Sequence, residues 1–123
     1  MRSVTRAYDE ALRPTGLRAT QLLLLVAIAA EGAVSISALA STMGMDRTTL
    51  TRNVEPLEKE GLIQRGEEAW RRSRSLKLTT AGRSVMSKAI PLWKTAQEHL
   101  REKLGEKDWS AVHEMLNRLI GAA

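Results

Sequence analysis

Hydroxyl and guanidinium side chains gather on one predicted helix near the middle of this 123-residue chain. The stretch "DRTTLTRNVEPLEKEG" opens with Asp46, a favoured helix N-cap, and closes with Gly61, a residue typical of helix ends. Its apolar residues recur at core-facing spacing, at Leu50, Val54 and Leu57. The residues that this leaves for contacts outside the core are Arg47, Thr48, Thr49, Thr51 and Arg52.

These side chains suit the grooves of DNA. An Arg guanidinium donates bidentately to guanine O6 and N7, and a Thr offers a hydroxyl for phosphates or bases and a methyl for thymine. The first turn of a helix also directs backbone N–H groups toward phosphate. The alternative is a merely solvated face, but β-branched Thr is a poor residue for that purpose because it lowers helix stability. The pattern therefore favours contact with nucleic acid.

A charged hairpin is predicted directly after this helix. The short β-compatible runs "LIQR" and "SLKL" are separated by "GEEAWRRSR". Residues 65–83 hold six positive side chains against two negative ones, which is most of the net charge of +5. Arg71, Arg72 and Arg74 at the hairpin tip would reach a neighbouring minor groove or the DNA backbone.

The remaining segments read as helices. "SVTRAYDEALRP" is expected to begin at the N-cap Ser3 and end at Pro14, and "ATQLLLLVAIAAEG" to form a buried central helix. "VSISALASTMG" precedes the opening stretch, so the two form a helix-turn-helix. After the hairpin, Thr79 caps a long helix that Gly105 breaks, and a last amphipathic helix follows. Pro56 either kinks its helix toward the hairpin or is tolerated near the helix end.

This order predicts a mainly α fold with a small β-hairpin wing. A winged helix-turn-helix lobe is expected at about residues 33–82, within a single domain that covers residues 1–123. The flanking helices, at about 1–17 and 83–123, have little to pack on in so small a core, so we expect them to form a dimer.

Several classes of protein are disfavoured by composition. The absence of Cys excludes disulfides and thiolate metal sites, and two His residues are too few for a zinc site without several carboxylates. The longest apolar run, residues 22–30, is too short to span a bilayer, and no signal peptide is apparent, so a cytoplasmic location is expected. No catalytic constellation stands out, and we expect neither enzymatic activity nor a metal or other cofactor.

The chain resembles the MarR family of winged-helix transcriptional regulators. The resemblance rests on "GLRATQLLLLVAIA", "ISALASTMGMDRTTLTRNVEPLEKEGLIQR" and "RRSRSLKLTTAG", and it covers essentially the whole chain. It implies a homodimer that places two recognition helices in successive major grooves of a palindromic operator in double-stranded DNA. It also implies repression relieved by a small aromatic or anionic effector, bound between the dimer-forming helices and the DNA-binding lobe.

One position departs from the family pattern. The resemblance places an acidic residue two positions before the wing Arg, which is Arg72 here, but Trp70 stands at that position. Whether Glu67 or Glu68 takes the role of that acidic residue is left open by the sequence. A different function also stays open, since a winged helix can serve protein–protein docking without DNA binding. A docking face should carry more exposed apolar surface than this hairpin and this Thr/Arg face do.

We predict that Arg72→Ala weakens DNA binding broadly across sequences, because a wing contact to the backbone carries no sequence information. The salt dependence of the affinity should flatten, with the slope of log K against log salt falling by about 1. A salt titration of binding to one duplex measures both effects. Unchanged affinity and an unchanged slope would exclude the wing contact.

Overall fold

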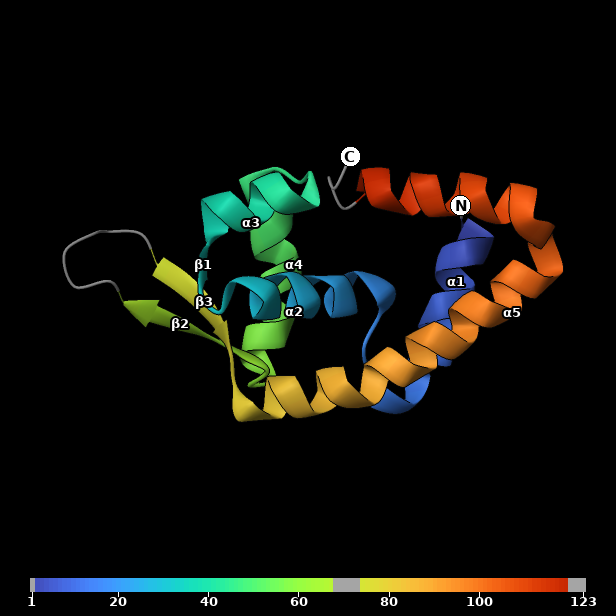
Figure 1. The fold of residues 1–123 in the computed structure, drawn as a ribbon. Coiled ribbons are helices and arrows are strands. Elements are labelled where there is room, and N and C mark those ends of the chain that lie inside the picture. The colour runs from blue at the N-terminus through green and yellow to red at the C-terminus, as the bar shows by residue number, and fades with distance from the viewer. Residues whose placement is uncertain (1, 68–73, 120–123) are drawn as a thin grey trace.

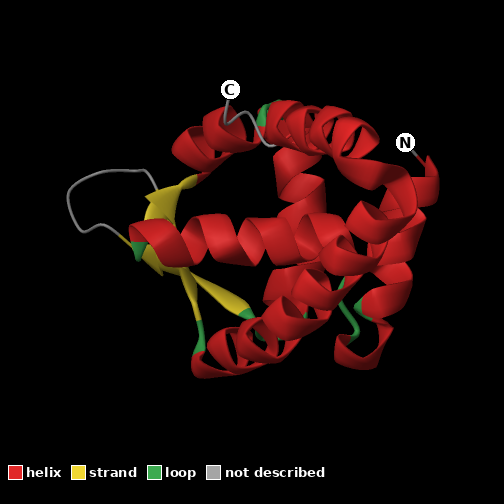
Figure 2. Ribbon diagram, turned by 45° about the vertical axis from the view of Figure 1, so that its right-hand side comes forward, coloured by secondary structure: helices red, strands yellow, loops and turns green. Residues whose placement is uncertain are grey.

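Helices make up most of the protein, and a small sheet lies at one end of it (Figures 1 and 2). The computed structural model describes residues 2–67 and 74–119. Its elements are, in chain order, α1 (Arg2–Ala11), the 3-10 helix η1 (Arg13–Thr15), α2 (Ala19–Glu31), β1 (Val34–Ser35), α3 (Ile36–Met43), α4 (Arg47–Lys59), β2 (Ile63–Glu67), β3 (Arg74–Leu78) and α5 (Thr80–Leu119). The predicted mainly α fold with a β-hairpin wing is confirmed. None of the helices in these ranges could cross a membrane.

Local capping residues set most helix ends where the sequence predicts them. The Ser35 hydroxyl accepts a hydrogen bond from the Ala38 N–H at 3.1 Å, at the start of α3. Gly44 ends α3 in the left-handed conformation, with φ at 65°. Because glycine lacks Cβ, it adopts this conformation without strain, and the chain turns sharply into α4.

The N-terminus of α2 is capped from another helix. The Ala19 N–H donates to Oδ1 of Asp9, on α1, at 2.7 Å. A carboxylate at a helix N-terminus satisfies a free N–H and complements the positive end of the helix dipole. This bond therefore fixes the start of the central helix relative to α1.

The sheet has a third strand that the sequence does not predict. Its strand order is β1-β3-β2, and both pairings are antiparallel. The short β1 pairs Val34 with Leu76 and Ser35 with Ser75, directly before α3. The helix-turn-helix and the hairpin are thus joined through β3 as well as through the chain.

The first helix packs against the rest of its own chain, contrary to our expectation that it has little to pack on. Tyr8 and Leu12 are 1% and 0% exposed. The Tyr8 ring stacks on that of Trp93 in α5, with ring centroids 4.0 Å apart and an interplanar angle of 20°. The Tyr8 hydroxyl is buried without a hydrogen-bond partner, and burial raises its pKa to about 12. Aromatic stacking thus fastens α1 to α5.

The structure bears on three features that the sequence analysis assigns to helix ends. The first helix begins at Arg2, so Ser3 lies inside it, and it ends at Ala11 before Pro14, which lies in η1. Pro56 lies inside α4 near its end, and its carbonyl accepts from the Glu60 N–H at 3.0 Å. The predicted break at Gly105 is confirmed, because its φ of 75° and ψ of 168° interrupt α5. Beyond that break the helix runs back over the molecule (Figure 1).

The first turn of α5 presses against the turn between α4 and β2. The Thr79 N–H donates to the Leu62 carbonyl at 3.0 Å, and the Thr79 hydroxyl donates to the Gly61 carbonyl at 2.6 Å. The same hydroxyl accepts from the Gly82 N–H at 3.0 Å, so Thr79 is the predicted N-cap. A Cβ on Gly82 would overlap the carbonyl oxygen of Leu62. This junction, made by Gly61, Leu62, Thr79 and Gly82, therefore requires glycine at position 82.

We predict that Gly82→Ala destabilises the protein by about 2 kcal/mol, because the overlap is with backbone that cannot move aside. Without the overlap, Ala would stabilise this helix by up to about 1 kcal/mol. Urea unfolding measures the difference. Ser87→Ala, at an exposed position of α5, is the matched control and should stay within about 0.5 kcal/mol of wild type. A Gly82→Ala protein as stable as wild type would contradict the assigned contact.

Candidate nucleic-acid interface

The inner face of α4 anchors this helix in the core. Leu50, Val54 and Leu57 are each fully buried. The helix packs against α3, α2 and β2. Burying a Leu or Val side chain contributes roughly 1.5–3 kcal/mol each, so the orientation of α4 is strongly held. The predicted opposition between an apolar inner face and a polar outer face is confirmed.

The outer face of α4 forms a shallow hollow of about 380 Å³. Its lining residues are Arg47, Thr48, Thr51, Arg52 and Glu55. Four of the five predicted contact residues on α4 thus come together. The fifth, Thr49, is half-buried and does not line the hollow. Its main-chain groups are engaged by Asp46 and by Asn53, whose amide donates to the Thr49 carbonyl at 2.9 Å.

Glu55 is the lining residue that our predicted set lacks. It is exposed, and it lies one helical turn beyond Thr51. A carboxylate in a groove accepts from the N4 amino group of cytosine and repels phosphate. Glu55 therefore restricts what the hollow can bind, rather than adding general affinity for anions.

Asp46 holds the N-terminal turn of α4 in place. Its Oδ1 accepts from the Thr49 N–H at 2.7 Å, which confirms the predicted N-cap. The hydrogen bonds from the Thr49 backbone and side chain, with a smaller contribution from the Arg52 charge, lower the pKa of Asp46 below its ordinary value of 3.8. A lowered pKa means that the cap stabilises the folded state at neutral pH and is lost only as the pH falls through that value. The cap is therefore intact at neutral pH.

The two strands of the wing, β2 and β3, are among the described residues, and residues 68–73 between them are not. Arg74 is the first residue of β3, opposite Glu67 in β2. Arg71 and Arg72 lie outside the described residues, as do Glu68 and Trp70. Lys77 is an exposed cation on β3. The predicted wing contacts thus stay predictions.

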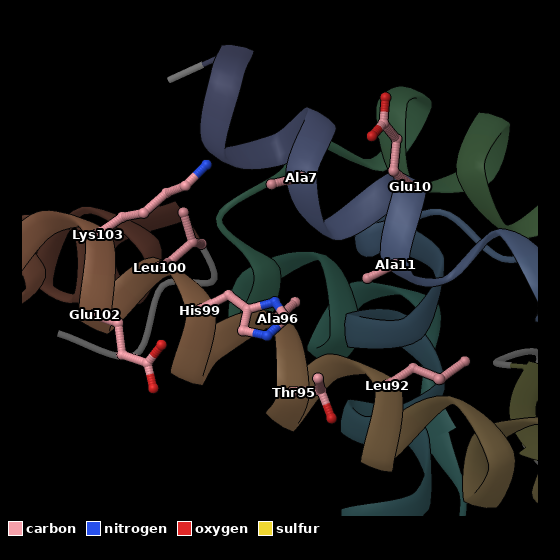
Figure 3. A pocket seen from close by; sticks show the side chains of 10 residues that line it. All are labelled: Ala7, Glu10, Ala11, Leu92, Thr95, Ala96, His99, Leu100, Glu102 and Lys103. Atoms are coloured by element: carbon pink, nitrogen blue, oxygen red, sulfur yellow. The ribbon is translucent and has the colours of Figure 1, made fainter.

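A second hollow, of about 720 Å³, lies between α1 and α5 (Figure 3). Its floor is apolar, and its rim carries charged or ionisable groups. The residues that line it are Ala7, Glu10, Ala11, Leu92, Thr95, Ala96, His99, Leu100, Glu102 and Lys103. Trp93 lies on the same stretch of α5 but does not line the hollow. Its ring packs against the ring of Tyr8 instead. The hollow has the composition of a small-molecule site, which is mostly apolar with a few polar groups.

The sequence and the fold of this chain are similar to those of known proteins. The MarR family model matches residues 17–68. The transcriptional regulator MosR of M. tuberculosis, in complex with DNA, is 37% identical, with a TM-score of 0.82 over 98% of this chain and 87% of that chain. The structure of MosR described without DNA has 35% identity and a TM-score of 0.76, over 98% of this chain and 87% of that one.

A more distant likeness shows the fold alone. A cysteine-to-serine mutant of E. coli MarR, complexed with operator DNA, is 22% identical, with a TM-score of 0.82 over 96% of this chain and 86% of that chain. No curated protein sequence matches this chain. The family model, the identity to MosR and the near-complete coverage agree with the geometry described above. The chain belongs to the MarR family of transcriptional regulators.

Proposed function

We propose that this protein binds a palindromic operator in double-stranded DNA as a homodimer and represses transcription until an effector binds. The observation that carries the proposal is the hollow on α4, in which two Arg and two Thr side chains face outward from a helix that is firmly anchored on its other side. In this account Arg47, Thr48, Thr51 and Arg52 contact DNA from the major groove. Thr49 supports them from within the turn, and Arg71, Arg72 and Arg74 act from the wing.

The DNA-bound relatives support this mode of binding. MosR was solved with DNA, and it is similar to this chain in fold, with a TM-score of 0.82, and in sequence, with 37% identity. The match to DNA-bound MosR also has a higher TM-score, 0.82, than the match to the structure described without DNA, 0.76. We propose that α4 enters the major groove and that the wing follows the neighbouring backbone or minor groove.

The homodimer is proposed from the terminal helices. Residues 83–123 continue well beyond the helix-turn-helix, and the part of α5 after Gly105 turns back over the protomer (Figure 1). Together with residues 1–17, they are proposed as the dimerisation helices, and residues 33–82 as the DNA-binding lobe. A two-fold dimer presents two copies of α4 to half-sites about one helical turn, roughly 34–36 Å, apart.

The hollow between α1 and α5 is proposed as the effector site. The family resemblance implies a site between the dimer-forming helices and the DNA-binding lobe, whereas both walls of the hollow come from the helices proposed for dimerisation. Its apolar floor suits an aromatic ring, and Lys103 on the rim suits an anionic group (Figure 3). Binding there would shift the population of dimers away from the spacing that fits the operator.

A protein-docking winged helix is the rival function. Such a face should show exposed apolar side chains. Leu50, Val54 and Leu57, the large hydrophobic side chains of α4, are all fully buried, and the exposed Val26 lies on α2. The outer face of α4 thus favours DNA. We propose a cytoplasmic DNA-binding protein without catalytic activity.

Selection of bound fragments from a random duplex pool, followed by a salt titration on the selected duplex, tests the proposed function. We expect an enriched palindrome with half-sites about 10 base pairs apart. Affinity for it should fall steeply with salt, with a slope near −0.9 for each phosphate contacted. No enrichment together with salt-insensitive binding would favour the docking function.

Thr51→Ala tests whether α4 reads bases. We expect discrimination at one base pair of each half-site to fall about tenfold, because loss of a single base contact has an effect of this size. The salt slope should stay the same, because Thr51 carries no charge. A repeat of the selection with the variant measures both, with Ser87→Ala as the control on α5. An unchanged base preference would place Thr51 outside the groove.

A further inference from the structure

An ion pair joins the recognition helix to the base of the wing. The Nε of Arg65, in β2, donates to Oε1 of Glu58, in α4, at 3.1 Å, and lies 3.1 Å from Oε2 as well. The side chains of Arg65 and Glu58 are 22% and 35% exposed. By contrast, Arg6 and Glu10, one turn apart on α1, are 3.9 Å apart and 82% and 68% exposed. The Glu58–Arg65 pair is thus closer, better shielded and formed between two separate elements.

Neither residue is explained by its own element. Side chains along a strand alternate between faces, so Arg65 shares a face with Ile63, which is 2% exposed. Its cross-strand partner in β3 is Leu76, which is fully buried. A cation on this inward face needs a counter-charge, because desolvation penalises an isolated one. Glu58 in turn lies in the last turns of α4, where the helix dipole disfavours a negative charge. Each residue is accounted for by the other.

The position of the pair along the hairpin gives it a consequence for the wing. Arg65 is followed by Gly66, which has no side chain with which to hold the strand. The strand β2 ends at Glu67, two residues after Arg65. The β2–β3 ladder continues past Arg65 through Gly66–Ser75 and Glu67–Arg74. The ion pair therefore holds the hairpin against α4 near the base of the hairpin.

We propose that Glu58 and Arg65 are positioning residues for DNA binding, which set the angle between the wing and the recognition helix so that both reach their grooves at once. The proposal rests on the proposed function. In this proposal an ion pair at the base of the wing sets its direction. The family pattern expects an acidic residue near the wing tip, where this chain has Trp70. Neither residue touches DNA in this account. Each acts through the direction it gives to the wing.

The variant Glu58→Gln tests the proposal on the full-length protein, with the selected operator as the probe. Its matched control is Glu60→Gln, an equal change of charge at an exposed position two residues on. We expect Glu58→Gln to weaken operator binding about tenfold and to lower the salt slope, since wing contacts to phosphate are lost. Hydroxyl-radical footprints should lose protection at the operator flanks and keep it at the half-site centres. The control should stay within about twofold of wild type.

Rescue separates positioning from a general loss of stability. The double variant Glu58→Arg with Arg65→Glu restores opposite charges at the same two positions, and we expect it to recover most of the affinity and the flank protection. An affinity loss no larger than that of Glu60→Gln would overturn the proposal, provided that the wild type binds its operator. A uniform loss across the footprint, or a folded double variant without rescue, would overturn it too.

A measurement without DNA keeps the proposal apart from the proposed function. Amide hydrogen exchange on the free protein should show faster exchange in the outer β2–β3 ladder of Glu58→Gln, at Gly66 and Ser75, with α4 unchanged. Exchange at wild-type rates in that ladder would overturn the positioning role, whatever the protein binds. If the ladder loosens but the wild type selects no duplex, the proposed function fails while the assigned role of the pair in holding the wing stands.

Discussion

The close approach of α5 to the turn between α4 and β2 is the constraint on which the rest of the structure depends. Thr79 donates to two successive carbonyls of that turn, and Gly82 leaves room for the second of them. The end of α4, the start of β2 and the start of α5 therefore meet within a few residues. A side chain at position 82 would separate all three, because the contact is between backbones.

The junction also gives a physical route between the two halves of the protein. The hollow between α1 and α5 begins at Leu92, about three turns along α5 from Gly82. Directly after Leu92, Trp93 stacks on Tyr8, and Asp9 on α1 caps α2, so α1, α2 and α5 are held to one another. Within the proposed function, a ligand that displaces α5 along its axis must also move Leu62 and the end of α4. The chain contains no Cys, so such a switch would work through packing and charge and not through thiol oxidation.

Local signals account for the parts of the fold that the sequence predicts. Ser35, Asp46 and Thr79 cap the helices expected of them, and Gly105 breaks the last one, because capping and chain reversal depend on neighbouring residues alone. The two faces of α4 follow from periodicity in the same way, and so does most of the candidate site.

The parts that were not predicted depend on contacts between distant residues. The strand β1 has two residues and no periodicity to reveal it, and the capping of α2 by Asp9 spans ten residues from another helix. The packing of Tyr8 on Trp93 joins opposite ends of the chain. Arg65 is different, because its spacing of two from the buried Ile63 marks an inward-facing cation in the sequence itself. Its partner Glu58 could be identified only once α4 and β2 were placed side by side.

Affinity cleavage tests most directly the central claim that the outer face of α4 lies in the major groove. Because the chain has no Cys, Glu55→Cys provides a single attachment point for an iron–EDTA reagent on that face, and Glu98→Cys provides a control at an exposed position of α5. The account predicts two clusters of cleavage, one in each half-site and about one helical turn apart, for the first protein and none for the second. Cleavage spread evenly along the duplex, or equal cleavage from both positions, would contradict it.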